Sequence, residues 1–406
     1  MKRFIIDDLR KWKESKRRKP LILRGARQVG KTWILEEFGK DFSDGFVRIN
    51  FDKEPEYAQF FEKSKDVKRI IQNLSFAIGK KITTNTLVIF DEIQACPLAL
   101  NSLKYFCEDA PEYYVCAAGS LLGLTLSEGF PVGKVDFLDM SPMCFLEFLI
   151  ACGDDSLVDY IKCISSIENI PNAFHDKLIE RLKMYFVIGG MPEAVKMWVE
   201  DNDIKEVDRI LSSILDAYES DFGKHAPLND VPKIRLIWDS LPSQLAKENK
   251  KFLYSAVKQG ARAREYENAL NWLKNADLIM KVSKITKPAL PIKSYEDISA
   301  FKIYMNDVGL LRKHSNLSTS SFVEENRLFT EFKGSLTENY VLESLTRKIE
   351  VNPYYWADNN YEVDFVIQID NGIYPIEVKA GINVQAASIK QYLQTYNETK
   401  VGIRFS

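Results

Sequence analysis

The stretch LILRGARQVGKT at residues 21–32 decides the fold of this chain. Residues 21–24 have the apolar composition of a short buried strand, and they run directly into a segment that matches the phosphate-binding pattern GxxxxGK[ST] in full. In such a P-loop the glycines let successive N–H groups point inward at the β- and γ-phosphates, where the next helix adds partial positive charge. We therefore expect an ATP-binding loop formed by Gly25, Ala26, Arg27, Gln28, Val29, Gly30, Lys31 and Thr32.

A second segment supplies the carboxylates that ATP hydrolysis needs. Residues 86–92, TLVIFDE, predict a buried strand that ends in Asp91 and Glu92. Lys31 would bring a mobile ammonium to the phosphates, and Thr32 would bring a hydroxyl to Mg²⁺. We expect Asp91 to hold Mg²⁺ through water and Glu92 to orient and activate the attacking water. An acidic helix N-terminus is the alternative for this pair alone, and the P-loop upstream argues against it.

Short apolar segments recur on both sides of these motifs. Further strands are predicted at residues 46–51, 113–118 and 135–138, with helical or loop segments between them. Strands that alternate with helices favour a parallel sheet covered on both faces, so residues 1–140 are expected to form an α/β P-loop domain. Ser120 follows the strand at 113–118 and would reach the γ-phosphate.

The remaining chain divides into three predicted parts. Residues 141–230 fit helical periodicity, with GGMP at 189–192 ending one helix and starting the next. Residues 231–290 predict three short helices closed by a strand pair that begins near residue 278, which is the layout of a winged-helix module. Residues 291–406 predict a linker and then a compact α/β segment from about Gly334. The fold class is thus α/β multidomain.

The winged-helix segment is locally basic. From Lys233 to Lys287 there are twelve Lys/Arg against five Asp/Glu, whereas the whole chain has a net charge of -2. Any nucleic-acid site must therefore be local, and Arg262 and Arg264 at the start of the third helix could contact a groove of duplex DNA. The alternative is a solvated helical surface that packs on the P-loop domain.

A hairpin near the C-terminus carries another set of charged residues. Two strand-like runs flank Asn371-Gly372, the strongest short hairpin signal. With these two as the turn, Asp364 would face Lys379, and Asp364, Glu377 and Lys379 would share one side of the hairpin. This resembles restriction-endonuclease-like, PD-(D/E)xK folds, in which two carboxylates hold Mg²⁺ and the lysine polarises water. Glu338 on the preceding helix could join the metal shell, and a cross-strand ion pair on a solvated face is the alternative.

Composition excludes several classes of protein. Of the 406 residues, 46% are hydrophobic and 28% are charged, which is typical of a globular chain rather than a disordered one. Acidic residues follow the N-terminus too soon for a signal peptide, and no apolar run approaches a membrane span, so we expect a cytoplasmic protein. The cysteines and histidines show no metal-ligand spacing, which favours buried free thiols.

Several segments together resemble one family. GARQVGKT, LVIFDEIQ, AAGSLLG and PVGKVDFLDMSPMCFLEF occur in this order, followed by YFVIGGMPEAV and then by EVDF and PIEVKA. They look like the prokaryotic AAA-superfamily P-loop ATPases that bear an uncharacterised conserved C-terminal region. The resemblance implies a five-stranded sheet with the Ser120 strand between those of the P-loop and Asp91, a catalytic Glu92, and Ser120 as a sensor. The family usually has arginine where this chain has Lys134, and lysine cannot clamp a phosphate bidentately, so an arginine finger is in doubt.

Two hypotheses for function follow from these patterns. The leading one is an ATPase, using ATP and Mg²⁺, that controls a DNA-associated, nuclease-like C-terminal domain through the helical and winged-helix parts. The other is a slow nucleotide switch that signals by binding protein partners, with a catalytically inactive C-terminal scaffold. Salt-dependent binding of duplex DNA would favour the first, and metal-independent protein binding without DNA affinity the second.

Overall fold

The computed structural model describes residues 1–62, 64–120, 122, 131, 133–166, 169–247, 250–319, 330–349, 351–358, 361–380, 387–399 and 401–405. Contacts divide the chain into two compact units. Unit 1 comprises Met1–Ser141 with Asn275–Asp277, and unit 2 comprises Pro142–Lys274 with Leu278–Ser406. The segments expected at 141–230, 231–290 and 291–406 fall within unit 2, apart from residues 275–277. Two of the quoted segments, AAGSLLG and PVGKVDFLDMSPMCFLEF, lie partly outside the described residues, at Leu121, Gly123 and Val132.

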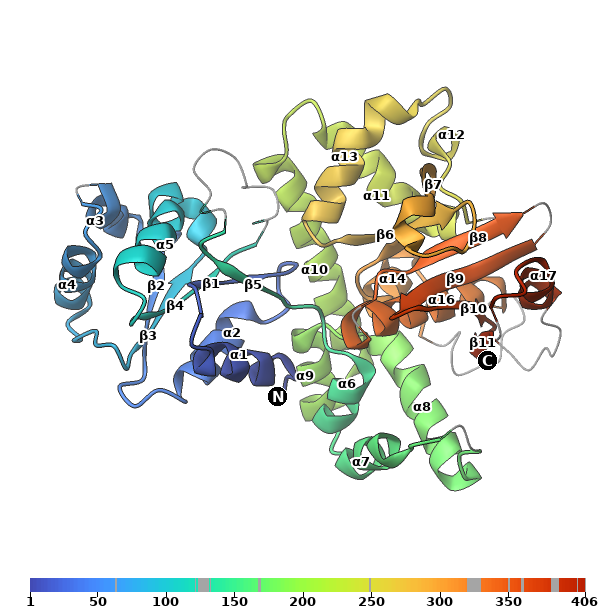
Figure 1. The fold of residues 1–406 in the computed structure, drawn as a ribbon, viewed down its shortest axis with the longest axis horizontal. Coiled ribbons are helices and arrows are strands. Elements are labelled where there is room, and N and C mark those ends of the chain that lie inside the picture. The colour runs from blue at the N-terminus through green and yellow to red at the C-terminus, as the bar shows by residue number, and fades with distance from the viewer. Residues whose placement is uncertain are drawn as a thin grey trace. The chain divides into compact units, whose positions relative to one another are not determined.

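Unit 1 is built on a five-stranded parallel sheet of order β2-β3-β4-β1-β5 (Figure 1). Its strands are β1 (Leu21–Arg24), β2 (Phe46–Asn50), β3 (Leu87–Asp91), β4 (Tyr114–Ala118) and β5 (Asp136–Asp139). The expected strand order is confirmed, because β4 lies between the P-loop strand β1 and the Asp91 strand β3. The carboxyl ends of these three strands therefore meet at one edge of the sheet.

Helices cover both faces of this sheet. They are α1 (Ile5–Glu14), α2 (Lys31–Gly39), α3 (Gln59–Glu62), α4 (Val67–Ile78) and α5 (Pro97–Asp109), with short 3-10 turns at η1 (Pro55–Ala58) and η2 (Ile93–Ala95). The period of two along the strands explains the arrangement. Val88 and Phe90 enter a core shared with α4 and α5, whereas Tyr114 packs edge-on against Trp12 of α1. The predicted two-sided α/β core is confirmed.

Unit 2 begins with helices. They are α6 (Phe145–Ala151), α7 (Asp155–Cys163), α8 (Asn172–Ile188), α9 (Pro192–Asp201), α10 (Ile204–His225), α11 (Val231–Leu245), α12 (Tyr254–Val257) and α13 (Ala263–Asn275). Later in the chain, the described residues also form α14 (Val308–His314), α16 (Thr330–Lys348) and α17 (Ala387–Thr395). The break predicted at GGMP is confirmed, because α8 ends and α9 begins on either side of it.

The second half of unit 2 is organised by a six-stranded mixed sheet of order β11-β10-β9-β8-β6-β7. Its strands are β6 (Ile279–Ile285), β7 (Glu296–Met305), β8 (Tyr354–Asp358), β9 (Tyr361–Ile369), β10 (Gly372–Val378) and β11 (Ile403–Phe405), with a 3-10 turn η3 at Ile292–Tyr295. The expectation of a linker after residue 290 is wrong for residues 296–314, which form β7 and α14. The strand was missed because its last six residues are all buried, so it lacks the alternation of a half-buried strand.

The predicted hairpin forms with a different turn. Ile369 pairs with Gly372, so Asp370 and Asn371 make the turn instead of Asn371 and Gly372. Asp370 adopts a left-handed conformation with φ 51°, which aspartate tolerates better than most residues. The expected pairing of Asp364 with Lys379 is therefore wrong. Because the register moves by two positions, the charged residues still share one side of the hairpin.

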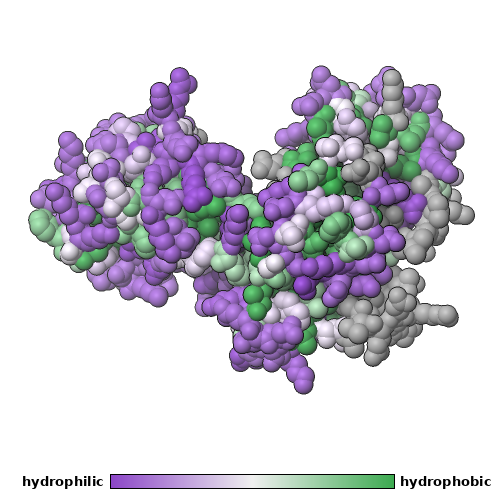
Figure 2. Space-filling model, turned by 90° about the horizontal axis from the view of Figure 1, so that it is seen from below, coloured by the Kyte–Doolittle hydropathy of each residue, from purple (hydrophilic) through white to green (hydrophobic). Residues whose placement is uncertain are grey.

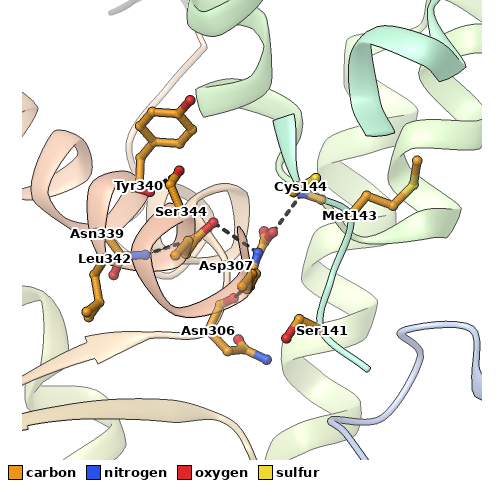
Figure 3. Close-up of polar contacts among 12 residues, drawn as sticks. Ser141, Met143, Cys144, Asn306, Asp307, Asn339, Tyr340, Leu342 and Ser344 are labelled. Atoms are coloured by element: carbon orange, nitrogen blue, oxygen red, sulfur yellow. Dashed lines mark hydrogen bonds and ion pairs between the residues drawn. The ribbon is translucent and has the colours of Figure 1, made fainter. Parts of the chain in front are cut away.

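A buried polar cluster in unit 2 includes Asp307 and Asn339 (Figure 3). The Asp307 carboxylate accepts hydrogen bonds from the backbone N–H of Gly190 at 2.7 Å and of Leu310 at 3.0 Å. Beside it, Asn339 of α16 exchanges hydrogen bonds with the backbone of Met305. The YFVIGGMPEAV segment, which contains Gly190, therefore joins helices that are distant in sequence, and its role here is structural.

On the face seen in Figure 2 hydrophilic residues predominate, with hydrophobic ones interspersed. Strongly exposed apolar side chains include Phe76, Leu228 and Ile298, at 77%, 84% and 75% exposure. Among the described residues, no helix is both long enough and apolar enough to cross a bilayer.

Candidate functional site

The P-loop joins β1 to α2. Its two glycines, Gly25 and Gly30, are required for different structural reasons. Gly30 has φ 94° where α2 begins, a left-handed conformation that glycine adopts without strain. Gly25 has φ 141°, and a Cβ there would lie 2.1 Å from the Met140 carbonyl oxygen. Any larger residue at Gly25 would push the loop away from the end of β5.

The Lys31 side chain is buried within the P-loop. Its Nζ donates to the carbonyl oxygens of Gly25 at 2.8 Å and Ala26 at 2.7 Å. Burial lowers the pKa of Lys31 to about 8. Charged acceptors bind an ammonium more strongly than neutral carbonyls do, so a triphosphate would compete effectively for this side chain.

The side chains of Thr32, at the start of α2, and Asp91, at the end of β3, lie close together. Thr32 Oγ1 donates to Asp91 Oδ1 at 3.1 Å, and Asn50 Nδ2 donates to Asp91 Oδ2 at 3.3 Å. The nearest guanidinium atom, Arg48 Nε, is 3.9 Å from Asp91. Burial raises the pKa of Asp91 above its ordinary value. A hydroxyl and a carboxylate so close together are hard oxygen ligands that fit Mg²⁺ bound jointly with phosphate oxygens.

Glu92 follows Asp91 with a backbone in the left-handed region at φ 49°. Non-glycine residues rarely adopt this conformation, and such strain gathers at functional sites. Gln94 Nε2 donates to Glu92 Oε2 at 2.5 Å. The amide oxygen of Gln94 in turn lies against Gly119, where an added Cβ would sit only 2.0 Å from it. Gln94 therefore links the Glu92 carboxylate to the end of β4.

Ser120 and Lys134 complete the predicted residues of unit 1. Ser120 is buried two positions beyond the end of β4, at the same edge of the sheet as the P-loop. Lys134 lies near the start of β5 and pairs with Glu108 of α5, with 2.8 Å between Nζ and Oε1. Both of these side chains are 45% exposed, so the pair is a surface ion pair.

The C-terminal residues predicted from the hairpin come from three elements of unit 2. Glu338 lies on α16, Asp364 on β9 and Glu377 on β10. Asp364 Oδ2 accepts a hydrogen bond from the backbone N–H of Val378 at 2.8 Å, which fixes it beside β10. Lys379 Nζ lies 3.0 Å from Glu377 Oε1. The structure thus gathers the predicted residues into one neighbourhood, which we call the C-terminal cluster.

Two lysines that sequence reasoning missed enter the same cluster. Lys250 pairs with Glu338, and Lys302 of β7 pairs with Glu362 of β9. The Lys302 side chain has no exposed surface, and Tyr304 also donates to Glu338 at 3.1 Å. Among the polar contacts of the cluster, ion pairs with lysine therefore dominate.

The charges in this cluster shift one another's protonation. Burial would lower the pKa of Lys302, yet the carboxylates of Glu362, Glu338 and Asp364 raise it above its ordinary value. Burial and the nearby Glu338 raise the pKa of Asp364 to about 7. Burial would raise the pKa of Glu338, yet the ammonium groups of Lys250 and Lys302 together lower it below its ordinary value. Asp364 is thus a carboxyl group of the cluster that titrates near neutral pH.

The C-terminal cluster does not fit a divalent cation as it stands. Within the described part of the chain, no three or more His, Cys, Asp or Glu side chains are arranged to hold a metal ion. Glu338, Glu362 and Glu377 each already face a lysine ammonium. A divalent cation at this place would therefore compete with lysine ammonium groups for these three carboxylates.

The basic segment has the element order predicted for it. Helices α11, α12 and α13 precede the antiparallel pair β6 and β7, and β6 also pairs with β8 of the C-terminal sheet. Arg262 and Arg264, at the start of α13, are both exposed. These arginines are accessible to a large partner.

The sheet and the P-loop of unit 1 resemble those of P-loop ATPases of the AAA kind. Residues 17–149 match the family model described as "AAA domain". Two further matches are to models described as domains of unknown function: DUF8612 at residues 179–321 and DUF4143 at residues 333–406. No curated protein matches the chain.

Three solved structures with some likeness to this chain are the following. The Walker-type ATPase PABY2304 of Pyrococcus abyssi is 15% identical, with 76% of this chain and 94% of that chain covered at a TM-score of 0.47. PCH-2 of C. elegans is 14% identical, covering 53% and 66% with a TM-score of 0.30. The Aeropyrum pernix ORC1 protein, in a complex with DNA, is 10% identical, covering 79% and 92% with a TM-score of 0.28.

Proposed function

We propose that this protein binds and hydrolyses ATP with Mg²⁺ at the P-loop of unit 1. The observation that carries the proposal is the meeting of Thr32 Oγ1 and Asp91 Oδ1 at 3.1 Å, beside the buried Lys31. Bound Mg²⁺ would supply positive charge to the phosphates, with Thr32 and Asp91 as its protein partners. Residues 25–32 would bind the phosphates through backbone N–H groups.

The catalytic roles fall on the residues around Asp91. Lys31 would leave the Gly25 and Ala26 carbonyls and bind the β- and γ-phosphates. Glu92 would accept a proton from the attacking water, for which its hydrogen bond from Gln94 must loosen. Ser120 would contact the γ-phosphate and report its presence.

Two substitutions test this proposal. Lys31→Ala should abolish Mg-ATP binding in titration calorimetry, because it removes the ammonium that offsets the phosphate charge. Glu92→Gln should keep Mg-ATP binding but lower turnover by about 10²- to 10⁴-fold, the usual contribution of general acid–base catalysis. Lys40→Ala, at the exposed end of α2, is the matched control and should behave like wild type. Unchanged turnover in Lys31→Ala would refute the assignment of the site.

We further propose that nucleotide state controls a DNA-associated C-terminal part, with Arg262 and Arg264 as phosphate contacts. The local excess of lysine and arginine and the exposure of both arginines support this role. Affinity for duplex DNA should fall with salt and fall further in Arg262→Ala/Arg264→Ala, and duplex DNA should change ATP turnover. Salt-independent binding, or none, would favour a protein-binding switch instead.

The nuclease-like assignment remains a proposal about fold rather than activity. Asp364, Glu377 and Lys379 share one side of a hairpin, which supports a PD-(D/E)xK-like arrangement with Glu338 on the adjacent helix. The lysine partners of these carboxylates favour an inactive scaffold. We expect no Mg²⁺-dependent nicking of duplex DNA by the wild type. Nicking that disappears in both Asp364→Ala and Lys379→Ala would overturn that expectation.

A further inference from the structure

An arginine near the N-terminus reaches the P-loop from outside. Arg3 precedes α1 and is only 6% exposed. Its Nη1 donates to the carbonyl oxygen of Val29 at 2.9 Å, and its Nη2 donates to that of Ser141 at 2.6 Å. One guanidinium therefore joins the middle of the P-loop to the last residue of unit 1 before the chain enters unit 2.

The geometry of a P-loop explains why this bond matters. When successive N–H groups of the loop turn inward to phosphate, some of the intervening carbonyls must turn away from it and find other donors. Val29 is fully buried, so solvent cannot satisfy its carbonyl. Leaving such a buried acceptor without a donor is costly, and a charged donor forms a stronger bond than a neutral one.

The segment that follows β5 holds the other end of the loop. The Met140 N–H donates to the Arg24 carbonyl at 2.8 Å, and the Met140 carbonyl is the group against which Gly25 packs. Met140 thus contacts the start of the loop directly, and Ser141 is connected to the middle of the loop through Arg3. The loop is held between two fixed points, and Arg3 supplies the second.

We propose that Arg3 is a positioning residue for the ATP site, holding the Val29 peptide so that the neighbouring N–H groups face the phosphates. This inference rests on the proposed ATP-binding function of the same loop. Arg3 itself lies on the carbonyl side and does not touch the nucleotide. A planar fork can bridge two carbonyls at once, whereas a lysine ammonium is a single point of charge.

The test compares Arg3→Ala and Arg3→Lys with Arg10→Ala. Arg10 lies on α1, is half-exposed and pairs with Asp41 at the surface, so it controls for loss of an arginine from this region. In titration calorimetry Arg3→Ala should weaken Mg-ATP binding by about tenfold, Arg3→Lys should recover part of the loss, and Arg10→Ala should match wild type. At saturating Mg-ATP, kcat in Arg3→Ala should stay within about threefold of wild type, because no reacting group is removed.

Hydrogen exchange distinguishes positioning from general destabilisation. In nucleotide-free protein, Arg3→Ala should speed amide exchange at residues 28–32 while leaving α4 and α5 unchanged. Equal exchange at the loop together with wild-type affinity would overturn the proposal, and so would equally faster exchange throughout unit 1. If Arg3→Ala does not fold, Arg3→Lys carries the same comparison. If wild type binds no Mg-ATP, the proposed function fails, while the exchange comparison still tests the role of Arg3.

Discussion

Buried and partly buried carboxylates in unit 1 and unit 2 have different kinds of neighbours. In unit 1, Asp91 is contacted by the hydroxyl of Thr32 and the amide of Asn50, with a guanidinium only at 3.9 Å. In unit 2, Glu338 and Glu362 are each paired directly with a lysine ammonium. Both places gather acidic groups in buried surroundings, and of these three carboxylates only Glu338 and Glu362 are paired directly with a lysine.

This difference separates a site that needs a ligand from one that does not. A buried carboxylate held by neutral donors gains from a cation that arrives with a substrate, as Mg-ATP would. A carboxylate already paired with a buried lysine has its charge compensated within the chain, and a metal would have to displace that lysine. The comparison supports the proposed ATP site in unit 1 and favours charge compensation within the chain at the C-terminal cluster.

The largest expected effect is a loss of stability in unit 2, and it tests whether the carboxylates there depend on their lysines. Lys302→Met should lower the free energy of unfolding by about 3 to 5 kcal/mol, because it leaves buried carboxylates without their cation. Urea unfolding followed by tryptophan fluorescence measures this loss.

Two further variants make the interpretation of Lys302→Met specific. Lys293→Met replaces an exposed lysine of the same unit and should change stability by less than about 0.5 kcal/mol. Lys302→Met/Glu362→Leu should recover part of the loss, since an apolar pair can replace a buried ion pair. A Lys302→Met protein as stable as wild type would mean that the C-terminal cluster does not depend on its lysines.

The next effect concerns affinity for the metal in unit 1. Asp91→Asn should weaken Mg²⁺-dependent ATP binding by about 10- to 100-fold, the usual cost of losing a group that orients a metal's ligands. Glu338→Gln should leave this affinity within about twofold of wild type. Calorimetric titration with ATP at several Mg²⁺ concentrations makes the measurement. Equal losses of ATP affinity in Asp91→Asn and Glu338→Gln would contradict the assignment of the metal to unit 1.

Much of unit 1 was predictable because its signals are local. The P-loop pattern occupies consecutive positions, and strand ends in a parallel sheet bring Thr32, Asp91 and Ser120 to one edge wherever the order of strands is known. That order came from the resemblance to a family, and the structure confirms it. Gln94 was quoted within LVIFDEIQ but not recognised as the partner of Glu92, since only side-chain geometry reveals that contact.

The C-terminal cluster was only half predictable. A side-chain period of two placed Asp364, Glu377 and Lys379 on one side of the hairpin, and this survived the error in the turn because the register moved by an even number of positions. The contacts of Lys250 and Lys302 could not be predicted from this periodicity. Lys250 and Glu338 are 88 positions apart, and nothing in the local sequence around either one indicates that they meet.

A smaller effect is expected in the pH dependence of stability. The pKa of Asp364 is raised to about 7, so the folded protein holds this proton more tightly than the unfolded chain does. Its contribution to stability is therefore full below about pH 4 and is lost as the pH rises to about 7. Asp364→Asn removes the titrating group and should reduce the loss of stability between pH 5 and pH 8 by about 2 to 3 kcal/mol.

The control for this titration is Asp370→Asn. Asp370 is exposed in the hairpin turn, and asparagine tolerates the same left-handed backbone. Urea unfolding at the two pH values should give the same difference for Asp370→Asn as for wild type. If Asp364→Asn shows the same difference in unfolding free energy between the two pH values as wild type, another group in the cluster must be the one that titrates. The charged neighbours of Asp364 are Glu338, Lys250 and Lys302.

The smallest effect falls on the general base of unit 1. Gln94→Ala removes the hydrogen bond that holds Glu92 Oε2 at 2.5 Å, and a net bond of about 0.5 to 1.5 kcal/mol corresponds to a rise in kcat of about 2- to 10-fold. Affinity for Mg-ATP should not change, because Gln94 contacts none of the proposed phosphate or metal ligands through that bond. Steady-state turnover and calorimetry on the same preparation separate the two quantities. A fall in kcat would show instead that Gln94 orients Glu92 for proton transfer, which would make the contact part of the active arrangement rather than a restraint on it.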